Sequence, residues 1–512
     1  MPVKIPESGR PVTGCRPVAR CRMRAPLIHV KHYTLGFCDL TVVSVQFKNM
    51  NTQPDLVFDP KLIQRFDVNG PRYTSYPTAD RFVEAFDASA LRDWLAKRAI
   101  GGTSRPLSLY FHIPFCNTIC YYCACNKIIT KDHGRSAKYL SYLDKEIGLQ
   151  ADALGGDRQV TQLHLGGGTP TFLTHEEMRQ LMDSVRARFN LVANGEYSIE
   201  VDPRKVDFDT VSLLADLGFN RMSIGVQDFN PEVQQAVNRV QSIDETRLVM
   251  ESARITGFKS ISMDLIYGLP KQNVISFNRT LEQVLELSPD RISLYNYAHL
   301  PSLFKPQRRI NSAELPSGEV KLQILQLAIR RLTQAGYVYI GMDHFAKPDD
   351  ELTIAQRQGR LHRNFQGYST QAECDLLAFG VSAIGKIGPV YAQNVKTLDE
   401  YYDALDRDTL PVLRGIELTA DDLLRRAVIQ ALMCQFELSI ESIEIAHLIR
   451  FNEYFAEELD DLRAMADAGL VSIDDEWIAV LPAGRLLVRG IAMVFDRYLR
   501  ADRERARYSK VI

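Results

Sequence analysis

The chain has 512 residues, of which 46% are hydrophobic and 24% charged, and its formal net charge is −2. This composition is that of a soluble globular protein with two or three domains, and the balanced charge argues against a nucleic-acid-binding surface. Nine cysteines in so long a chain do not make a disulfide scaffold, which favours a reducing compartment. Because no apolar run approaches the roughly 18 to 20 residues of a membrane span, we expect a cytoplasmic protein.

The first 49 residues differ in composition from the rest of the chain. They contain eight Lys or Arg residues against Glu7 and Asp39, and five prolines. The prolines argue against the amphipathic helix of a transit peptide, and Asp39 interrupts the apolar stretch that a secretory signal would need. We therefore expect residues 1–49 to be a disordered or non-native extension, with the functional protein beginning at Met50.

Residues 50–104 are predicted to form an N-terminal arm with one helix at 88–97. A regular alternation of strands and helices follows over residues 105–345. The predicted strands are 107–113, 160–165, 197–201, 221–226, 260–266 and 291–295, and the predicted helices are 139–153, 176–188, 209–217, 245–255 and 276–286. Such alternation predicts parallel strands joined by right-handed crossovers. Polar residues follow all six strands, so the α/β fold is expected to be a partial (β/α)6 TIM-like barrel rather than a doubly wound sheet.

The remaining chain is predicted to form a connecting and substrate-contact region at 346–415 and a mostly helical domain at 416–512. In the latter, Thr419 begins a helix-capping pattern, and two short apolar runs flank the turn Asp474-Asp475-Glu476. Helices followed by a hairpin indicate a winged-helix-like module. Because the acidic turn would repel phosphate, we expect a lid domain rather than a DNA-binding domain.

Four cysteines lie within ten residues, at Cys116, Cys120, Cys123 and Cys125, just after the first predicted strand. Three thiolates with this spacing can bind three irons of a [4Fe–4S] cluster and leave the fourth iron open to a ligand. Zinc is the alternative, but zinc motifs pair one C-x-x-C with a second pair of ligands, and the other cysteines are isolated. A reduced patch of structural cysteines is a further interpretation. The spacing favours the cluster.

A glycine run, Gly166-Gly167-Gly168-Thr169-Pro170-Thr171, follows the second predicted strand. Glycines there let backbone groups approach a polar ligand, although most such runs are only turns. Together with the spacing Cys116-x3-Cys120-x2-Cys123, the run resembles the radical S-adenosylmethionine (SAM) superfamily. The resemblance implies that SAM chelates the open iron of the cluster and is cleaved to a 5′-deoxyadenosyl radical.

Further blocks narrow the resemblance to the family of oxygen-independent coproporphyrinogen III oxidases. They are Cys125 and the segments 72–77, 200–204, 223–227, 263–270 and 362–368, and the similarity extends over residues 55–499. The haem-chaperone branch shares the cysteine spacing and glycine run but typically lacks Cys125 and the block 72–77. The resemblance therefore implies oxygen-independent oxidative decarboxylation of two propionates of coproporphyrinogen III to vinyl groups, which gives protoporphyrinogen IX in haem biosynthesis.

The resemblance also implies a role for each matching position. The cluster ligands would be Cys116, Cys120 and Cys123, with Cys125 beside the cluster and not bound to iron. The catalytic positions would be Tyr110, Cys125 and Glu200. The cluster-bound SAM would meet Tyr110, Cys125, Gly167, Glu200, Gln227, Arg239 and Asp264. A second SAM, associated with the family, would meet Tyr122, Gly168, Thr169, Ala298 and Ile384.

Some of these residues have plainer interpretations. Arg239 could form a surface ion pair, and the apolar Ala298 and Ile384 could belong to the core. A buried Asp264 would need a partner, which favours a function for it. His112 and His164 flank the site loops without metal-ligand spacing and are predicted to be hydrogen-bonded core histidines.

The expected partners are coproporphyrinogen III and an electron donor of the flavodoxin or ferredoxin type, with no nucleic acid and no membrane. We expect a monomer, because no heptad repeat or apolar edge demands a second copy. Arg363 could bind a substrate propionate or lie on the surface. Two alternatives stay open: a haem-binding chaperone, which would bind haem tightly without SAM-dependent turnover, and a radical SAM enzyme that acts on another tetrapyrrole.

Overall fold

The computed structural model describes residues 56–98, 105–372 and 374–501. The predicted extension 1–49, Met50 and parts of the predicted arm lie outside these residues. Among the helices of the described ranges, none is both long and apolar enough to cross a membrane.

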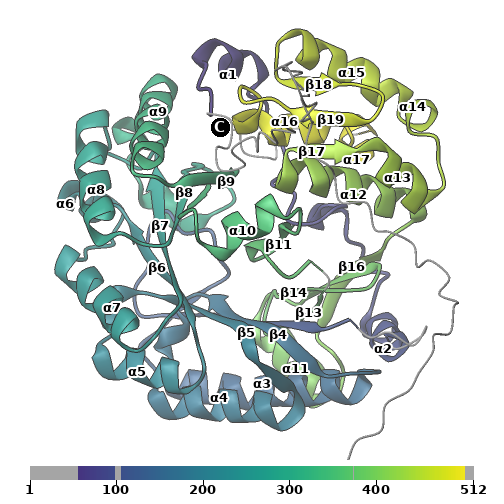
Figure 1. Ribbon diagram of the computed structural model, residues 1–512. Helices are drawn as coiled ribbons and strands as arrows, with labels where there is room; N and C mark the ends of the chain where they lie inside the picture. The colour runs from purple at the N-terminus through teal and green to yellow at the C-terminus, as the bar shows by residue number, and fades with distance from the viewer. Residues whose placement is uncertain (1–55, 99–104, 373, 502–512) are drawn as a thin grey trace, which may run out of the picture. The chain divides into compact units, whose positions relative to one another are not determined.

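A twelve-stranded sheet forms the centre of the fold, in the order β16-β15-β14-β13-β1-β4-β5-β6-β7-β8-β10-β9. Its middle consists of six parallel strands that pair in chain order and correspond to the six predicted ones. They are β1 (Leu107–Ile113), β4 (Gln159–Gly167), β5 (Asn190–Val201), β6 (Arg221–Gln227), β7 (Ser260–Tyr267) and β8 (Arg291–Asn296). Figure 1 shows that these strands curve as a partial barrel, which confirms the predicted fold class.

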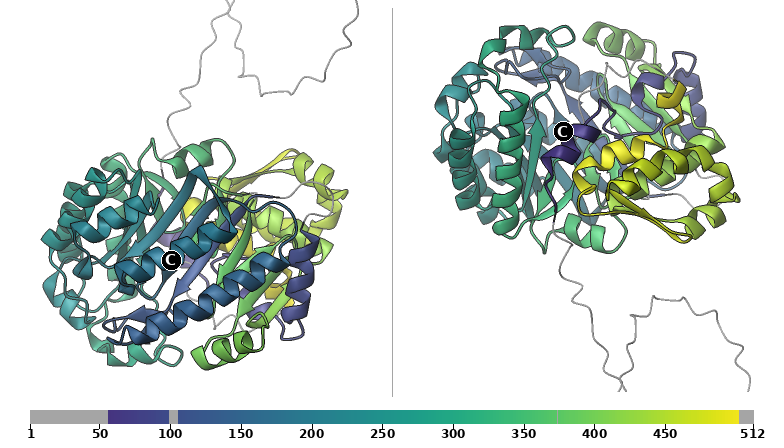
Figure 2. Two further views of the ribbon diagram at one scale, coloured as in Figure 1. Left: turned by 90° about the horizontal axis from the view of Figure 1, so that it is seen from below. Right: turned by 90° about the horizontal axis from the view of Figure 1, so that it is seen from above.

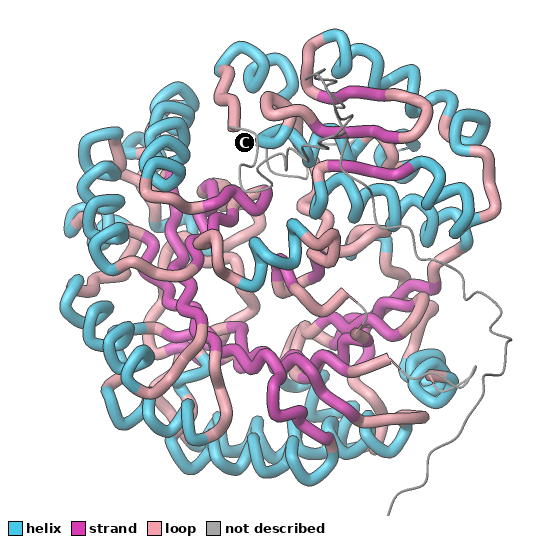
Figure 3. Tube along the Cα trace, in the orientation of Figure 1, coloured by secondary structure: helices cyan, strands magenta, loops and turns pink. Residues whose placement is uncertain are grey.

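Helices between the strands cover the outer face of this curved sheet (Figures 1 and 3). They are α3 (Gly134–Ala153), α4 (His175–Arg188), α5 (Phe208–Asp216), α6 (Pro231–Ala236), α7 (Ile243–Ile255), α8 (Val274–Leu287) and α9 (Gly318–Gln334). Capping boxes at Thr174 and Ser242 fix the starts of α4 and α7. Apolar residues of these helices pack on the sheet, and burial alternates along β6 and β7 between fully and partly buried residues.

Further strands extend the sheet at both ends. On one side β13 (Asp375–Phe379) pairs in parallel with β1, and the antiparallel strands β14 (Ile384–Ile387), β15 (Val390–Asn394) and β16 (Val412–Glu417) follow it. On the other side β10 (His344–Ala346) and β9 (Val338–Gly341) continue antiparallel from β8. A hairpin of β11 (His362–Asn364) and β12 (Gly367–Ser369) stands apart from the sheet.

The buried carboxylate of Glu146 fastens helix α3 to this extension. It accepts hydrogen bonds from the Tyr401 hydroxyl on α11 (Leu398–Asp406) at 2.6 Å, from the Asn394 amide at 2.7 Å and from the Gly380 N–H at 2.7 Å. Gln150 donates a fourth hydrogen bond at 3.1 Å. Burial raises the pKa of Glu146, while these donors oppose the rise. The network joins three elements that are far apart in the chain.

The C-terminal segment consists mainly of helices, which Figure 2 shows on the side of the sheet away from α5–α8. The elements are α12 (Ala420–Gln435), α13 (Ile440–His447), α14 (Phe451–Tyr454), α15 (Ala456–Asp467), α16 (Val488–Met493) and α17 (Arg497–Ala501), with the small sheet β17 (Glu437–Ser439), β18 (Val471–Ile473) and β19 (Trp477–Val480). The predicted cap at Thr419 and the predicted hairpin around the acidic turn are present. The winged-helix-like description of this domain stays a prediction.

The N-terminal arm packs against the C-terminal helices. Helix α1 (Pro60–Phe66) begins it, and α2 (Ala88–Lys97) ends it with the predicted bounds. Between them, the Tyr73 hydroxyl donates to the carboxylate of Asp496 at 3.0 Å, and the Tyr76 hydroxyl accepts from the Arg497 N–H at 3.3 Å. Both tyrosines are 1% exposed. These contacts hold the segment 72–77 in the interior.

Candidate active site

The carboxyl ends of the parallel strands surround a cavity of about 570 Å³, which we call the strand-end cavity. Its lining comes from the loop after β1 and from the ends of β4 to β8, as a barrel predicts. The predicted site residues that line it are Cys116, Cys120, Tyr122, Cys123, Cys125, Gly167, Gly168, Thr169, Glu200, Gln227, Arg239 and Asp264. Tyr110 lines a neighbouring cavity of about 260 Å³ that shares Cys125, Gly167 and Glu200 with the first.

The cysteine loop begins at the short strand β2 (Phe115–Cys116), which pairs with β3 (Ile128–Ile129). The Cys116 thiol accepts a hydrogen bond from the Thr169 hydroxyl at 3.4 Å, and the Cys120 thiol accepts one from the Arg239 guanidinium at 3.7 Å. A hydrogen bond from Cys125 lowers the pKa of Cys123 to about 6, whereas burial raises the pKa of Cys116 to about 11. The four thiols therefore occupy unequal environments, and Cys125 is the exposed one.

The residues present fit an iron–sulfur cluster better than a single metal ion. In the part of the chain that the structure describes, no group of three His, Cys, Asp or Glu side chains is placed to hold one metal ion. The predicted ligands Cys116, Cys120 and Cys123 instead line one cavity with room for a larger group. Hydroxyl and guanidinium donors to cysteine sulfurs are typical of cluster sites, where they tune the cluster.

Arg239 is the strongest positive group in the strand-end cavity. Its side chain is buried, its Nη1 forms an ion pair with Asp202 at 3.3 Å, and its Nη2 donates to the Gly225 carbonyl. Its buried Nε has no hydrogen-bond partner among the described residues. An orphaned donor of this kind fits an anionic group such as the carboxylate of SAM. The sequence left open that Arg239 forms an ion pair on the surface. That interpretation is wrong, because its ion pair with Asp202 is in the interior.

Two carboxylates face the cavity from β5 and β7, the strands on either side of β6. Glu200 accepts from the Gly167 N–H at 3.1 Å, and its Oε1 lies 3.5 Å from Nε2 of His164. Asp264 accepts from the Ser223 hydroxyl at 3.1 Å. Burial raises the pKa of Asp264 to about 6, and the negative charge of Glu200 adds to the rise. Both groups can accept hydrogen bonds from an ammonium or a ribose diol.

Tyr110 and Gln227 are positioned by local backbone and ring contacts. The Tyr110 hydroxyl lies 3.1 Å from Nδ1 of His112, and its ring stacks on His164 at 5.9 Å. Gln227 has a φ of 70°, where the register of β6 shifts against β7, and this bulge turns its side chain. The histidines are hydrogen-bonded as predicted, since Nε2 of His112 lies 2.9 Å from the Asn126 carbonyl oxygen and Nδ1 of His164 lies 2.5 Å from the Ser198 hydroxyl.

The glycine run packs directly on the start of the cysteine loop. The Gly168 N–H donates to the Ile113 carbonyl at 2.8 Å, and a Cβ on Gly168 would lie 2.8 Å from backbone atoms of Pro114 and Phe115. Gly167 has a φ of 119°, which favours glycine. Glycine is thus required here by the neighbouring loop, and the run fixes that loop in place. From the sequence alone, the glycines are expected to be needed for contact with a polar ligand.

The five positions implied for a second SAM do not share one cavity. Tyr122, Gly168 and Thr169 line the strand-end cavity. Ile384 lines the neighbouring cavity of about 260 Å³. Ala298 lines a separate cavity of about 980 Å³, and its carbonyl accepts from Gln307 at 3.2 Å. The structure therefore brings together only three of the five.

Asp202 and His164 support the site, although no role in it was assigned to them from the sequence. Asp202 follows Glu200 in the same block and pairs with both Arg239 and Arg204. His164 holds the ring of Tyr110 and contacts Glu200. The signal that could have found them is their place at or near the ends of parallel strands, where polar residues are otherwise rare.

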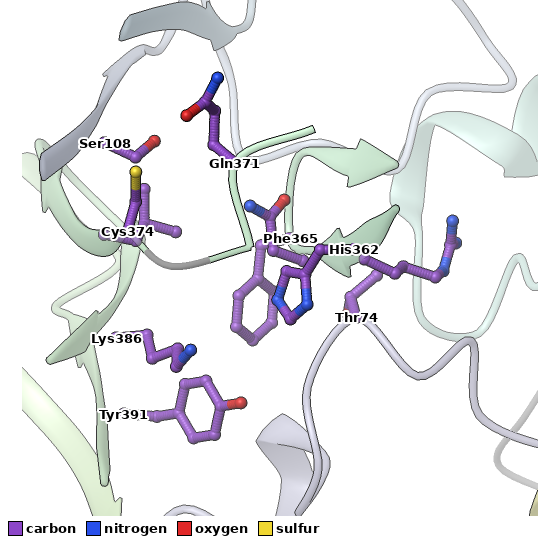
Figure 4. A pocket seen from close by; sticks show the side chains of 11 residues that line it. Thr74, Ser108, His362, Phe365, Gln371, Cys374, Lys386 and Tyr391 are labelled. Carbon is purple, nitrogen blue, oxygen red and sulfur yellow. The ribbon is translucent and has the colours of Figure 1, made fainter. Parts of the chain in front are cut away.

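Further cavities lie in the described region. The cavity of about 980 Å³, which we call the large cavity, is lined by the arm, the end of β8 and helix α9, and includes Arg72, Asn296 and Lys321. Figure 4 shows a smaller one between the β11 hairpin and strands β13 to β15, with His362, Lys386 and Tyr391 around it. At about 20 Å³, it has room for little more than one water molecule, and Arg363 also lines it.

Comparison with known proteins gives matches along most of the chain. The family model of the radical SAM superfamily matches residues 110–284, and that of the HemN C-terminal domain matches residues 418–487. A protein of Pseudomonas aeruginosa named oxygen-independent coproporphyrinogen III oxidase is 54% identical over 461 residues, which cover 89% of this chain and 99% of that protein. Its namesake in Escherichia coli is 51% identical over 455 residues, with 89% and 98% covered.

A solved structure is also similar along its whole length. It is described as coproporphyrinogen III oxidase (HemN) from Escherichia coli, a radical SAM enzyme. Its TM-score is 0.83 at 49% sequence identity, and the match covers 87% of this chain and 100% of that one. The similarity therefore includes the parallel strands and the C-terminal helices.

Proposed function

The chain belongs to the family of oxygen-independent coproporphyrinogen III oxidases, and from this premise we propose how its residues carry out the reaction. The enzyme is an oxidoreductase of the radical SAM superfamily, with a [4Fe–4S] cluster and SAM as cofactors. It converts two propionate groups of coproporphyrinogen III into vinyl groups and gives protoporphyrinogen IX; each propionate loses carbon dioxide, a hydrogen atom and one further electron, which passes to an electron acceptor. When bound, the cofactors supply a 5′-deoxyadenosyl radical that takes a hydrogen atom from a propionate.

Cys116, Cys120 and Cys123 hold the cluster in this proposal. Support comes from their common cavity and from the donors that Thr169 and Arg239 direct at two of the sulfurs. Cys125 lies beside the cluster and does not bind iron, because it is the exposed thiol of the four and hydrogen-bonds to Cys123. These are the positions that the family pattern assigns.

Arg239, Glu200 and Asp264 bind and orient SAM. The free Nε of Arg239 can donate to the methionyl carboxylate. Glu200 accepts from the ammonium group, and Asp264 accepts from the adenosyl part, near Gln227. Tyr110 borders the same cavities, where its hydroxyl, held by His112, can contact the bound cofactor. Three of the five positions for a second SAM, Tyr122, Gly168 and Thr169, adjoin this site.

The domains divide the work along the chain. Residues 105–345 bind the cofactors, residues 346–415 contact the substrate, and the helical domain 416–512 acts as a lid that keeps water and stray hydrogen donors from the radical. The described part of the arm, residues 56–98, contacts the C-terminal helices. A flavodoxin- or ferredoxin-type protein supplies the electron, and the enzyme acts as a monomer in the cytoplasm.

One observation carries the proposal: three thiols of the family pattern and the orphaned donor of Arg239 line one cavity at the strand ends. The test is an anaerobic assay with reductant, SAM and coproporphyrinogen III on wild type, Cys120→Ser and Cys374→Ser. Cys374 is a matched control because it is buried and hydrogen-bonded to Thr161, outside the strand-end cavity.

We expect 5′-deoxyadenosine and protoporphyrin from wild type and Cys374→Ser, and neither product from Cys120→Ser. Deoxyadenosine without any change in the porphyrin would move the substrate elsewhere. A protein that binds iron and haem tightly but makes neither product would be a haem chaperone instead.

A further inference from the structure

Three arginines from distant parts of the chain meet inside the fold, and we call them the arginine cluster: Arg72, Arg363 and Arg489. Arg72 precedes the buried Tyr73 of the arm, Arg363 lies on β11, and Arg489 lies on α16. Arg363 is 3% exposed and Arg489 is 1% exposed. The Nε of Arg363 donates to the Arg72 carbonyl at 3.2 Å, so the chain segments are in direct contact.

The charges of the arginine cluster repel one another. Burial lowers the pKa of Arg72 to about 10, and the positive charges of Arg363 and Arg489 add to this effect. The pKa of Arg489 is also lowered to about 10 by burial, which the carboxylate of Asp67 only partly offsets. Guanidinium groups that depress each other in this way share a region of low dielectric.

The carboxylates around the cluster do not balance it. Arg72 forms an ion pair with Asp343, and Asp67 faces Arg489. Arg363, by contrast, has no carboxylate within ion-pair distance among the described residues, and its buried Nη1 has no hydrogen-bond partner. The guanidinium carbon of Arg363 lies over the Tyr368 ring, 4.8 Å from the ring centroid, and this cation–π contact is favourable. Burying an unpaired charge is costly, so this position is suited to an anion that arrives with a ligand.

Arg72 is the member of the cluster that approaches both large cavities, whereas Arg363 lines the cavity of about 20 Å³. The guanidinium of Arg72 is 5.8 Å from the Tyr295 ring, and Tyr295 lines the strand-end cavity together with Glu200 and Asp264. Arg72 itself lines the large cavity, as does Asn296, the residue after Tyr295. A ligand that occupied the large cavity could therefore place one group at the cluster and another near the cofactors.

The neighbouring His344 adds no positive charge to the cluster. The ring of His344 packs edge-on against Tyr295 at 6.0 Å and Tyr368 at 5.3 Å. Burial, and then the charge of Arg363, lower the pKa of His344 well below its usual range, so its ring is neutral. Its Nδ1 has no partner in the described part of the chain, which leaves a second polar atom for a ligand.

We infer that Arg363, with Arg72, binds a propionate carboxylate of the substrate and so holds a neighbouring propionate at the strand-end cavity. The inference deepens the proposed function and rests on it. The chemistry is general: a guanidinium fork matches a carboxylate with two parallel hydrogen bonds. A substrate that carries four carboxylates around a ring can fill such a site with one of them while another reacts.

A purely structural role for Arg363 predicts a different result. If Arg363 only fastened the hairpin to the arm, its loss would lower the melting temperature. Any loss of binding would then be the same for a charged porphyrin and for its uncharged ester. If it awaits an anion, Arg363→Met removes an unpaired buried charge, keeps the length of the side chain, and leaves the melting temperature unchanged or raised. The two roles are therefore separable by one variant.

The experiment compares wild type, Arg363→Met, Arg363→Lys and the control Arg357→Met, all reconstituted with the cluster. Arg357 is an exposed arginine at the end of α10 (Glu351–Arg357), which is near in sequence but outside the cavities. Porphyrin fluorescence measures binding of coproporphyrin III and of its uncharged tetramethyl ester. Steady-state assays give KM for coproporphyrinogen III and, separately, for SAM.

We expect Arg363→Met to weaken coproporphyrin III binding about 10- to 100-fold, as for a lost charge-assisted hydrogen bond. The ester should bind wild type and variant alike, KM for SAM should be unchanged, and Arg363→Lys should recover part of the affinity. Equal binding of coproporphyrin III by wild type and Arg363→Met, or an equal loss for the ester, would overturn the inference.

The same measurements separate this inference from the proposed function. A wild type that converts coproporphyrinogen III while Arg363→Met shows an unchanged KM overturns the inference alone. A wild type that binds coproporphyrin III through Arg363 but converts no coproporphyrinogen III overturns the proposed function and supports the carboxylate site.

Discussion

Replacing Asp264 by asparagine should make the protein more stable and a poorer binder of SAM. Asp264 lies at the strand-end cavity, where burial and the charge of Glu200 raise its pKa from 3.8 to about 6. At 1.36 kcal/mol per pKa unit, this difference means that ionised Asp264 lowers the free energy of unfolding by about 3 kcal/mol at neutral pH. The isosteric Asp264→Asn keeps an acceptor for Ser223 and carries no charge.

The sign of the pH dependence follows from the raised pKa. The folded protein binds this proton more tightly than the unfolded chain, so its stabilising contribution is complete below pH 3.8 and is lost as the pH rises through about 6. Asp264→Asn and wild type should therefore unfold alike near pH 4, and the variant should be more stable by up to about 3 kcal/mol at pH 8. Anaerobic denaturant titrations across this range measure the difference.

The functional arm of the same prediction is the affinity for SAM. Loss of a hydrogen bond to a charged acceptor should weaken SAM binding about 10- to 100-fold, measured by equilibrium dialysis. Asp216→Asn, at an exposed carboxylate ending α5, should change neither quantity. A variant that is less stable than wild type, or a stability difference that does not depend on pH, would refute the argument from burial. Unchanged SAM affinity would refute the assigned role.

Two further predictions concern the cysteine loop and the fold. Cys125→Ser should keep the iron content of wild type, whereas Cys123→Ser should lose most of it; iron analysis after reconstitution checks both, and equal losses would make Cys125 a ligand. Glu146→Leu leaves the Tyr401 hydroxyl, the Asn394 amide and the Gly380 N–H without their acceptor, and should lower the free energy of unfolding by about 3 kcal/mol or more. An unchanged denaturant midpoint would contradict that account of the network.

The parallel half of the fold could be predicted because its signal is local. Each of the six parallel strands contains a short apolar run, and most of the helices between them have their own caps, so hydrophobic periodicity and helix-capping residues suffice to predict them. The extension β13 to β16 gave no such signal. Its strands are short, β13 to β15 follow one another without a helix between them, and β13 pairs with β1, which is more than 250 residues earlier in the chain. Only the tertiary structure reveals that pairing.

The residues of the candidate site also differ in whether a local sequence signal could predict them. The residues at strand ends, such as Glu200 and Asp264, could be gathered from sequence because a parallel sheet places those ends together. The burial of Arg363 could not, because a charged residue in a polar hairpin has no periodicity that distinguishes interior from surface. Ala298 shows a different limit of the sequence. Its match to a position of the family pattern does not indicate that it lines the large cavity.

The most direct test of the reaction follows a hydrogen atom. The enzyme is incubated anaerobically with reductant, SAM and coproporphyrinogen III that carries deuterium on its propionate β-carbons, and the deoxyadenosine is analysed by mass spectrometry. We expect deuterium in 5′-deoxyadenosine together with vinyl-bearing porphyrin. Deoxyadenosine without deuterium, beside vinyl-bearing product or unchanged substrate, would contradict abstraction from the propionate.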